Sequence, residues 1–170
     1  MIEIETNPFT PYIPENAQIL ILGSFPGREQ TQVQLDENQW FYGAKRNQLW
    51  KILSGVYQRE LQTKAEKKNL FDEVGIGMTD IFLKVRRIHN TNLDENLEIF
   101  EFNDTAIREI LNNHTFETIY FTSRFVGKHF MKLFPEVKNI DFLPSPSPRY
   151  ARMSLAEKVI YYSAKLPKLK

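Results

Sequence analysis

The most constraining feature of this chain is a short apolar run that ends in a glycine-bounded loop. Residues 19–22 are Ile-Leu-Ile-Leu, a pattern typical of a β-strand buried on both faces. The glycine loop that follows consists of Gly23, Ser24, Phe25, Pro26 and Gly27. Its glycines allow a sharp backbone path and a close approach by a ligand, and its proline stiffens it. Because open α/β sheets bind ligands where buried strands end, this loop is a candidate binding site; an ordinary turn from strand to helix is the alternative.

Length and composition limit the class of protein. The 170 residues, 42% of them hydrophobic, predict one domain over residues 1–170 with a substantial core. The formal net charge is +1, so any binding to nucleic acid must come from local charge. The absence of cysteine excludes disulfides, thiol catalysis and cysteine-ligated metals, including iron–sulfur clusters. The three histidines, His89, His114 and His129, lack zinc-site spacing, so we expect no metal.

The chain carries no recognisable secretion or membrane signal. Residues 1–7 are acidic and lack the basic and apolar regions of a signal peptide. No apolar run approaches the length of a membrane span. These features predict a cytoplasmic protein with no membrane partner, and a single small domain favours a monomer.

Strand patterns and helix patterns alternate along the chain. Besides residues 19–22, strands are expected at 74–82, 117–123 and 139–143. Helices are expected from Asn47 onward, at 63–72, 103–112 and 125–134, and from Ser154, where Glu157 completes a capping box. Residues 28–38 are polar and are expected to be irregular and mobile. The alternation predicts an α/β fold, a three-layer α/β/α sandwich around a mainly parallel sheet of about four strands.

Basic residues lie in several loops at the predicted carboxyl edge of that sheet. We call them the basic rim: Lys45, Arg46, Lys84, Arg86, Arg87, Arg124, Arg149 and Arg152. They would form a face suited to phosphate groups, while acidic residues cluster elsewhere in the sequence, between 94 and 104. Solvated surface charge is the alternative interpretation.

The last predicted strand is followed by a proline loop, residues 144–148, with the sequence Pro-Ser-Pro-Ser-Pro. Alternating proline makes this segment stiff and extended. Ser145 and Ser147 offer hydroxyls and free N–H groups that suit a phosphate, although a simple connector is equally consistent with the pattern.

Three segments together resemble the uracil-DNA glycosylase superfamily. Residues 22–27, Leu-Gly-Ser-Phe-Pro-Gly, resemble its first motif, and residues 143–148, Leu-Pro-Ser-Pro-Ser-Pro, resemble its second. Between them, residues 41–50, Phe-Tyr-Gly-Ala-Lys-Arg-Asn-Gln-Leu-Trp, resemble its aromatic and asparagine segment. The order and separation match over nearly the whole chain. The hypoxanthine-DNA glycosylase branch is the most similar, followed by the mismatch-specific uracil/thymine branch.

The resemblance implies a monofunctional glycosylase that flips a deaminated base, hypoxanthine or uracil, out of DNA and hydrolyses its N-glycosidic bond. It implies that the enzyme uses no cofactor. The implied partner is DNA that contains a deaminated or mismatched base. Tyr42 would stack on the base; the alternative is that it is an aromatic residue of the core. Asn47 would hold the attacking water or the base edge; the alternative is that it only caps a helix. The resemblance implies that the base is bound by Gly23, Ser24, Phe25, Pro26, Gly27 and Tyr42; Ser123, at the predicted edge of the sheet, is a further candidate. The resemblance implies that Ser145, Ser147 and Arg149 contact DNA; Lys45, Arg46 and Arg152 of the basic rim are further candidates for DNA binding.

The chain departs from the superfamily pattern at two places. Phe25 stands where many members carry an Asp or Asn that positions water, and Ala44-Lys45 stands where they carry His-Pro. Asp80, the only carboxylate expected at this edge, is therefore an alternative catalytic base; an ion pair with Arg86 or Arg87, or a turn cap, would be a structural role instead. Two other functions stay open: a damaged-DNA-binding module without catalysis, and a nucleoside or nucleotide hydrolase.

Overall fold

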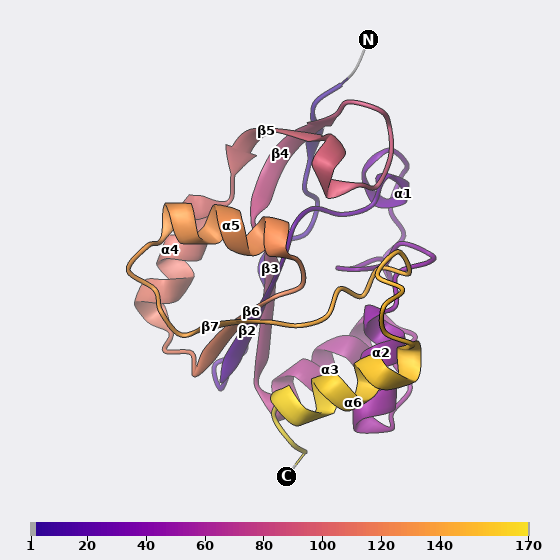
Figure 1. Ribbon diagram of the computed structural model, residues 1–170, viewed down its shortest axis with the longest axis vertical. Helices are drawn as coiled ribbons and strands as arrows, with labels where there is room; N and C mark the ends of the chain where they lie inside the picture. The colour runs from indigo at the N-terminus through magenta and orange to yellow at the C-terminus, as the bar shows by residue number, and fades with distance from the viewer. Residues whose placement is uncertain (1–2, 170) are drawn as a thin grey trace.

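A four-stranded parallel sheet forms the centre of the computed structural model, which describes residues 3–169. Its strands lie in the order β3 (Ile76–Asp80), β2 (Ile19–Gly23), β6 (Thr118–Phe121) and β7 (Ile140–Phe142) (Figure 1). The register pairs Gly23 with Asp80, so the glycine loop leaves the sheet beside the end of β3. The expected parallel sheet and its α/β class are confirmed.

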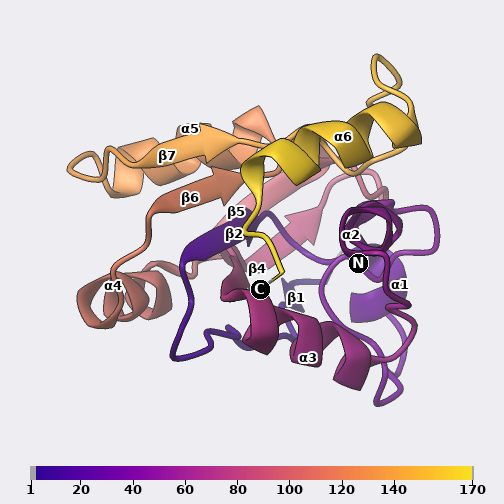
Figure 2. The same ribbon diagram turned by 90° about the horizontal axis from the view of Figure 1, so that it is seen from below.

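The side chains of β2 alternate between two hydrophobic clusters. Ile19 and Ile21 pack in the cluster covered by helices α2 (Leu49–Tyr57), α3 (Lys64–Val74) and α6 (Leu155–Lys165). Leu20 and Leu22 pack in the cluster covered by α4 (Asp104–Asn113) and α5 (Arg124–Leu133). Figures 1 and 2 show these two helical layers on opposite faces of the sheet. Burial on both faces explains why β2 is apolar at successive positions.

Local signals in the sequence set the ends of several helices. Thr63 and Glu66 form a capping box at the start of α3, and Ser154 and Glu157 form the predicted one at the start of α6. Helix α3 ends at Gly75, whose φ of 80° lies in the left-handed region that glycine adopts without strain. The chain then enters β3 directly.

A second sheet is absent from the sequence-based prediction. It is antiparallel, with the order β1 (Glu5–Thr6), β4 (Phe82–Arg87) and β5 (Leu97–Phe102), and the short helix η1 (Asp94–Asn96) precedes β5. The expectation of an irregular, mobile segment at 28–38 is also wrong in part, because residues 28–31 form the short helix α1 (Arg28–Thr31).

Cross-strand ion pairs in this second sheet join basic and acidic residues that are separate in the sequence. Lys84 lies 3.0 Å from Glu101, and Arg86 lies 2.5 Å from Glu98, measured between charged nitrogen and oxygen atoms. The basic and acidic runs are therefore two strands of one hairpin that neutralise each other, and Lys84 and Arg86 do not belong to a phosphate-binding face. Among residues 3–169, no helix has both the length and the apolar character needed to cross a membrane.

Candidate functional site

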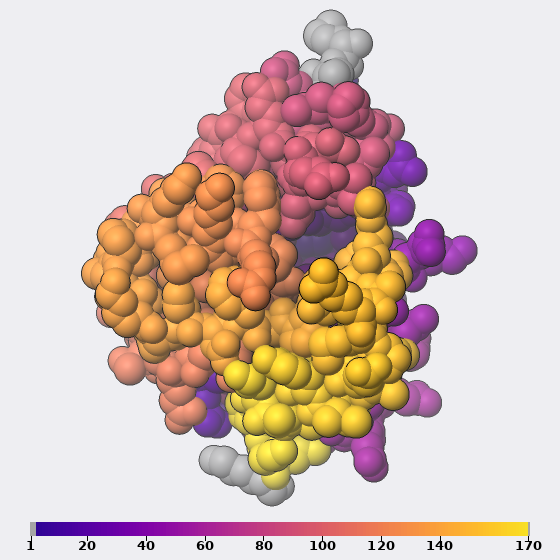
Figure 3. All heavy atoms as spheres, in the orientation of Figure 1, coloured from indigo at the N-terminus to yellow at the C-terminus, as the bar shows by residue number. Residues whose placement is uncertain are grey.

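A cavity of about 720 Å³ opens at the carboxyl edge of the central sheet. Figure 3 shows the hollow between the β4–β5 segment, α5 and the chain that precedes α6. Six segments line it: residues 24–30 from the glycine loop into α1, residues 42–47, the end of β3, the connecting loop between β4 and β5 at 91–95, residues 122–123, and residues 145–150. The segments that resemble the superfamily motifs therefore meet in one place.

Most of the predicted site residues line this cavity, and three do not. Those that line it are Ser24, Phe25, Pro26, Gly27, Tyr42, Arg46, Asn47, Asp80, Ser123, Ser145, Ser147 and Arg149. Gly23, Lys45 and Arg152 are not among the lining residues. Gly23 is buried, whereas Lys45 and Arg152 are exposed.

Gly23 is required by its neighbours rather than by a ligand. A Cβ atom at this position would overlap the hydroxyl of Tyr42 and would lie 2.7 Å from Oδ1 of Asp80. Only glycine lets these two polar side chains approach the end of β2. Gly23 therefore affects the cavity through the positions of Tyr42 and Asp80.

Tyr42 holds an uncommon backbone conformation at the cavity wall. Its φ of 56° lies in the left-handed region, which costs free energy for a residue with a side chain. Its hydroxyl makes a 2.7 Å hydrogen bond with Oγ1 of Thr122. Burial raises the pKa of Tyr42 well above its usual value, and the charge of Asp80 raises it further. The phenol therefore stays neutral, with its orientation set by Thr122.

Asn47 combines a structural contact with a place in the cavity. Its side-chain oxygen accepts a 2.9 Å hydrogen bond from the backbone N–H of Leu49, so it caps the first turn of α2, whose N-cap residue is Gln48. The cap uses the oxygen of the amide. The NH₂ group is then the part of Asn47 that remains for a ligand.

Asp80 is a buried carboxyl group at the floor of the cavity. It is 5% exposed and accepts a 2.9 Å hydrogen bond from the side-chain amide of Asn7. The ion-pair alternative is wrong, because Arg86 pairs with Glu98 and Arg87 pairs with Glu5. Burial raises the pKa of Asp80 to about 7; the Asn7 hydrogen bond opposes this shift, and the charge of Asp94 adds to it.

Asp94 is a site residue that the sequence reasoning missed, so the expectation of a single carboxylate at this edge is wrong. Its Oδ1 accepts a 2.7 Å hydrogen bond from the hydroxyl of Ser24. Burial raises its pKa, while hydrogen bonds from Ser24 and Ser123 and the charge of Arg87 oppose the shift. The Asn-rich stretch around it signals a turn, but no local signal shows that this turn folds over the glycine loop.

Arg87 is structural and does not belong to the basic rim. Its side chain is 3% exposed, and its guanidinium lies 3.1 Å from a carboxylate oxygen of Glu5. It also donates to the backbone oxygens of Pro26 at 2.6 Å and Thr91 at 3.0 Å. One arginine therefore joins the glycine loop to the connecting loop that carries Asp94.

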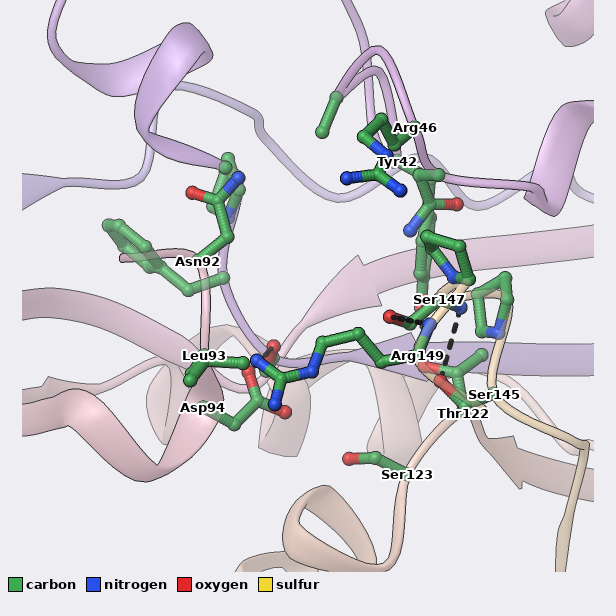
Figure 4. Close-up of a pocket in the computed structure, with 18 of the residues that line it drawn as sticks. Tyr42, Arg46, Asn92, Leu93, Asp94, Thr122, Ser123, Ser145, Ser147 and Arg149 are labelled. Carbon is green, nitrogen blue, oxygen red and sulfur yellow. Dashed lines mark hydrogen bonds between the residues drawn. The ribbon is translucent and has the colours of Figure 1, made fainter. Parts of the chain in front are cut away.

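The serines of the proline loop turn their polar groups toward their own backbone. The N–H of Ser147 donates to Oγ of Ser145, and the N–H of Arg149 donates to Oγ of Ser147, both at 3.2 Å (Figure 4). The expectation of a free N–H at Ser147 is therefore wrong. The loop also docks on α2, because the N–H of Gln48 donates to the oxygen of Pro146 at 2.8 Å.

The basic rim is reduced to two arginines at the cavity. Arg46 and Arg149 are exposed lining residues, and they enter the cavity region from different loops (Figure 4). The guanidinium of Arg124 instead lies 5.4 Å from the centre of the Phe142 ring. Within residues 3–169 no cluster of three or more His, Asp or Glu side chains is arranged to hold a metal ion.

A parallel α/β fold with a cavity at the carboxyl edge of its sheet defines a class of ligand-binding α/β domains. The family model described as "Uracil DNA glycosylase superfamily" matches residues 10–165. This match covers most of the chain, so the protein belongs to that superfamily.

Two individual proteins are similar to this chain. A hypoxanthine DNA glycosylase of Methanosarcina barkeri (strain Fusaro / DSM 804) is 33% identical over 106 residues, which are 58% of this chain and 60% of that protein. The aligned region thus spans less than two thirds of the relative's length. The solution NMR structure of a Methanosarcina acetivorans protein, provisionally named a uracil DNA glycosylase, has a TM-score of 0.62 and 24% identity. That alignment covers 95% of this chain and 98% of the other, and it supports the fold.

Proposed function

We propose that the protein is a monofunctional DNA glycosylase that removes a deaminated base, hypoxanthine or uracil, after flipping it into the cavity. The observation that carries the proposal is the meeting of Tyr42, Asn47 and the glycine loop in one cavity with Arg46 and Arg149 among its exposed lining residues. Flipping costs a few kcal/mol and requires a pocket that replaces base stacking. Membership of the superfamily and the name of the Methanosarcina barkeri relative support the same chemistry.

Each cavity group takes a role that its geometry allows. The ring of Tyr42 stacks on the flipped base, and backbone N–H groups near Ser24 and Phe25 bind a base carbonyl. The NH₂ group of Asn47 holds the base edge or the attacking water, while its oxygen caps α2. Arg46 and Arg149 contact phosphates beside the flipped nucleotide, and the side chain of Arg149 helps to fill the gap in the stack. The reaction as proposed uses no metal and no cofactor.

Duplexes that each contain one inosine, one uracil or one mismatched thymine test this proposal. Alkali after incubation cleaves any abasic site and so reports base release. We expect cleavage of at least one duplex by the native protein, and a loss of about 100-fold or more in Asn47→Asp, which keeps the capping oxygen but lacks the NH₂ group. Asn112→Ala, an exposed position on α4, is the matched control.

A damaged-DNA-binding module is the second candidate, favoured by Phe25 at the position where many superfamily members carry Asp or Asn. Its ring lies 5.6 Å from the guanidinium carbon of Arg87 and packs on the hydrophobic cluster below α5. Tight, salt-sensitive binding to all damaged duplexes with no cleavage would support this candidate and contradict the first. Activity on free nucleosides that ignores added DNA would instead indicate a nucleoside hydrolase.

A further inference from the structure

Two of the aspartates that line the cavity, Asp80 and Asp94, each have a neutral hydrogen-bond donor as a partner. Asp80 accepts from the amide of Asn7, and Asp94 accepts from the hydroxyl of Ser24. Arg87 acts on Asp94 by its charge, but its own ion pair is with Glu5. The other titratable or charged groups that line the cavity are Tyr42, Tyr150, Glu29, Glu95, Arg46 and Arg149. The floor of the site is therefore acidic, although cations are present at its wall.

An acidic floor constrains the leaving group of a glycosylase. When the bond between C1′ and the base nitrogen breaks, the electron pair stays on the base. A base that leaves as an anion is repelled by nearby carboxylates in a low-dielectric cavity. A base that receives a proton as it leaves avoids this repulsion.

Purines and uracil differ in their ability to receive that proton. Hypoxanthine has a ring nitrogen, N7, with an available lone pair. In uracil one ring nitrogen carries the sugar and the other carries hydrogen, so neither offers a basic lone pair. The acidic floor thus suits a purine lactam better than a pyrimidine.

We propose that Asp80 is the general acid that protonates N7 of a flipped hypoxanthine, in a cavity that also holds the carboxyl group of Asp94. This inference rests on the proposed glycosylase function and narrows its substrate class from deaminated bases in general to purine lactams. It also reverses the role of Asp80, which the sequence indicated as a base.

The step balances without an added reagent. The carboxyl group of Asp80 gives its proton to N7, the C1′–N9 bond breaks with its electron pair moving into the imidazole ring, and neutral hypoxanthine leaves. Water adds to the oxocarbenium-like C1′, and the proton that this water loses returns to the Asp80 carboxylate through solvent. The products are an abasic site and free hypoxanthine, and Asp80 is again protonated.

The protonation state of Asp80 agrees with this role. Burial is the main cause that raises its pKa to about 7, and the Asp94 charge acts in the same direction. A general acid is most effective when its pKa lies near the working pH. At neutral pH a substantial fraction of Asp80 therefore carries the proton that the reaction needs.

Single-turnover cleavage of inosine and uracil duplexes between pH 5 and pH 9 tests the proposal. For the native protein we expect inosine cleavage to be about 10-fold or more faster than uracil cleavage and to fall as the pH rises through about 7. Asp80→Asn should lose about 100-fold on inosine and lose this pH dependence. In Asp94→Asn the pH-dependent fall of the inosine cleavage rate should occur at lower pH. Its cleavage rate should equal the native rate at pH 5 and be several-fold lower than the native rate at pH 8. Both variants keep an acceptor for Asn7 or Ser24, and Asp36→Asn, exposed and outside the cavity, is the matched control.

A base analogue separates proton transfer from anion stability. The 8-aza-7-deaza analogue of inosine lacks the basic N7 but keeps an electron-poor ring that stabilises an anion. We expect it to bind as inosine does and to resist cleavage. Rapid cleavage of this analogue, equal rates on uracil and inosine, or native pH dependence in Asp80→Asn would overturn the proposal. Failure of the native protein on every duplex would instead overturn the glycosylase function and this inference with it.

Discussion

Lys158 on α6 donates a hydrogen bond to the backbone oxygen of Ser147 in the proline loop, 3.1 Å away. The same ammonium group donates to the side-chain oxygen of Gln48 at 2.8 Å, and the residue is 1% exposed. Burial lowers the pKa of Lys158. A buried lysine thus joins α6 and the approach to α2 to the loop that carries Ser147 and lies beside Arg149.

Replacing Lys158 with methionine should loosen this junction. Two acceptors, the Ser147 carbonyl and the Gln48 amide oxygen, would lose their donor, and an unsatisfied buried acceptor costs about 1–3 kcal/mol. We expect a lower free energy of unfolding in urea melts and weaker binding to an inosine duplex. Lys51→Met, at an exposed position on α2, should leave both unchanged. Native stability and binding in Lys158→Met would show that the proline loop is held by other contacts.

Arg149→Ala should weaken binding to DNA nearly uniformly across sequences, because a phosphate contact carries no sequence information. The clearest sign of a lost phosphate contact is a weaker salt dependence of binding. The slope of the logarithm of the binding constant against the logarithm of the salt concentration should decrease in magnitude by about 1 for each phosphate contact that is lost. Fluorescence anisotropy of a labelled duplex at several salt concentrations measures this slope. Arg46→Ala should behave in the same way, and Arg152→Ala, outside the cavity lining, should change the slope less. Equal slopes in all three variants would contradict the assignment of Arg46 and Arg149 as the phosphate contacts.

Arg87 and Arg86 are neighbours in sequence, but replacing Arg87 should destabilise the fold far more than replacing Arg86. Arg87→Met leaves the buried carboxylate of Glu5 without its cation, and breaking a buried pair in this way costs about 3–5 kcal/mol. Arg86→Met removes an exposed pair with Glu98, which is worth about 1 kcal/mol or less. Denaturant unfolding of both variants measures the difference. A similar small loss in both would mean that Arg87 does not join the glycine loop to the connecting loop.

Asp80→Asn should stabilise the fold at alkaline pH. The folded state raises the pKa of Asp80 from its ordinary acidic value to about 7. Between those two values the folded state holds a proton that the unfolded state has lost, so stability falls as the pH rises and the penalty is complete above about pH 7. Asparagine does not titrate and escapes this penalty. In thermal melts, Asp80→Asn should therefore have a higher melting temperature than the native protein at pH 8, and this difference should disappear toward pH 4. The melting temperature of Asp36→Asn should follow that of the native protein at every pH.

The expected effects of Asp80→Asn on stability and on catalysis are linked. If Asp80 serves catalysis, the substitution that stabilises the protein should also be the one that removes activity on inosine. A stabilised variant with full activity would indicate that the buried carboxyl has no role in the reaction. A variant that is less stable at pH 8 would instead indicate that the folded state favours the charged carboxylate and does not raise the pKa of Asp80.

The glycine loop and the proline loop were both recognisable in the sequence because their properties are local. Gly23 and Gly27 bound a loop after a buried strand, and three prolines in five residues exclude a helix from 144–148. The parallel sheet was equally predictable, since residues 19–22 of β2, buried on both faces, form a continuous apolar run. Asn47 was predicted both as a helix cap and as a cavity residue, and the structure places its oxygen on α2 and its side chain at the cavity wall.

The hairpin of β4 and β5 escaped prediction because its two strands are charged and half exposed. Lys84 and Arg86 are balanced by Glu101 and Glu98 across the hairpin, and no single segment reveals such a pairing. The same hairpin brings Asp94 to Ser24, 70 positions earlier in the chain. Long-range contacts of this kind depend on how whole elements pack and leave no periodic pattern in the sequence.

By itself, then, the sequence determined the α/β class, the helix ends and the motif segments, because backbone sterics, capping and apolar periodicity act over a few residues. Tertiary structure alone decided which of those residues share the cavity, which arginines are exposed, and which carboxyl groups are buried together. The physical reason is that burial and charge proximity, which set the pKa of Asp80, are properties of the packed chain and not of any segment of it.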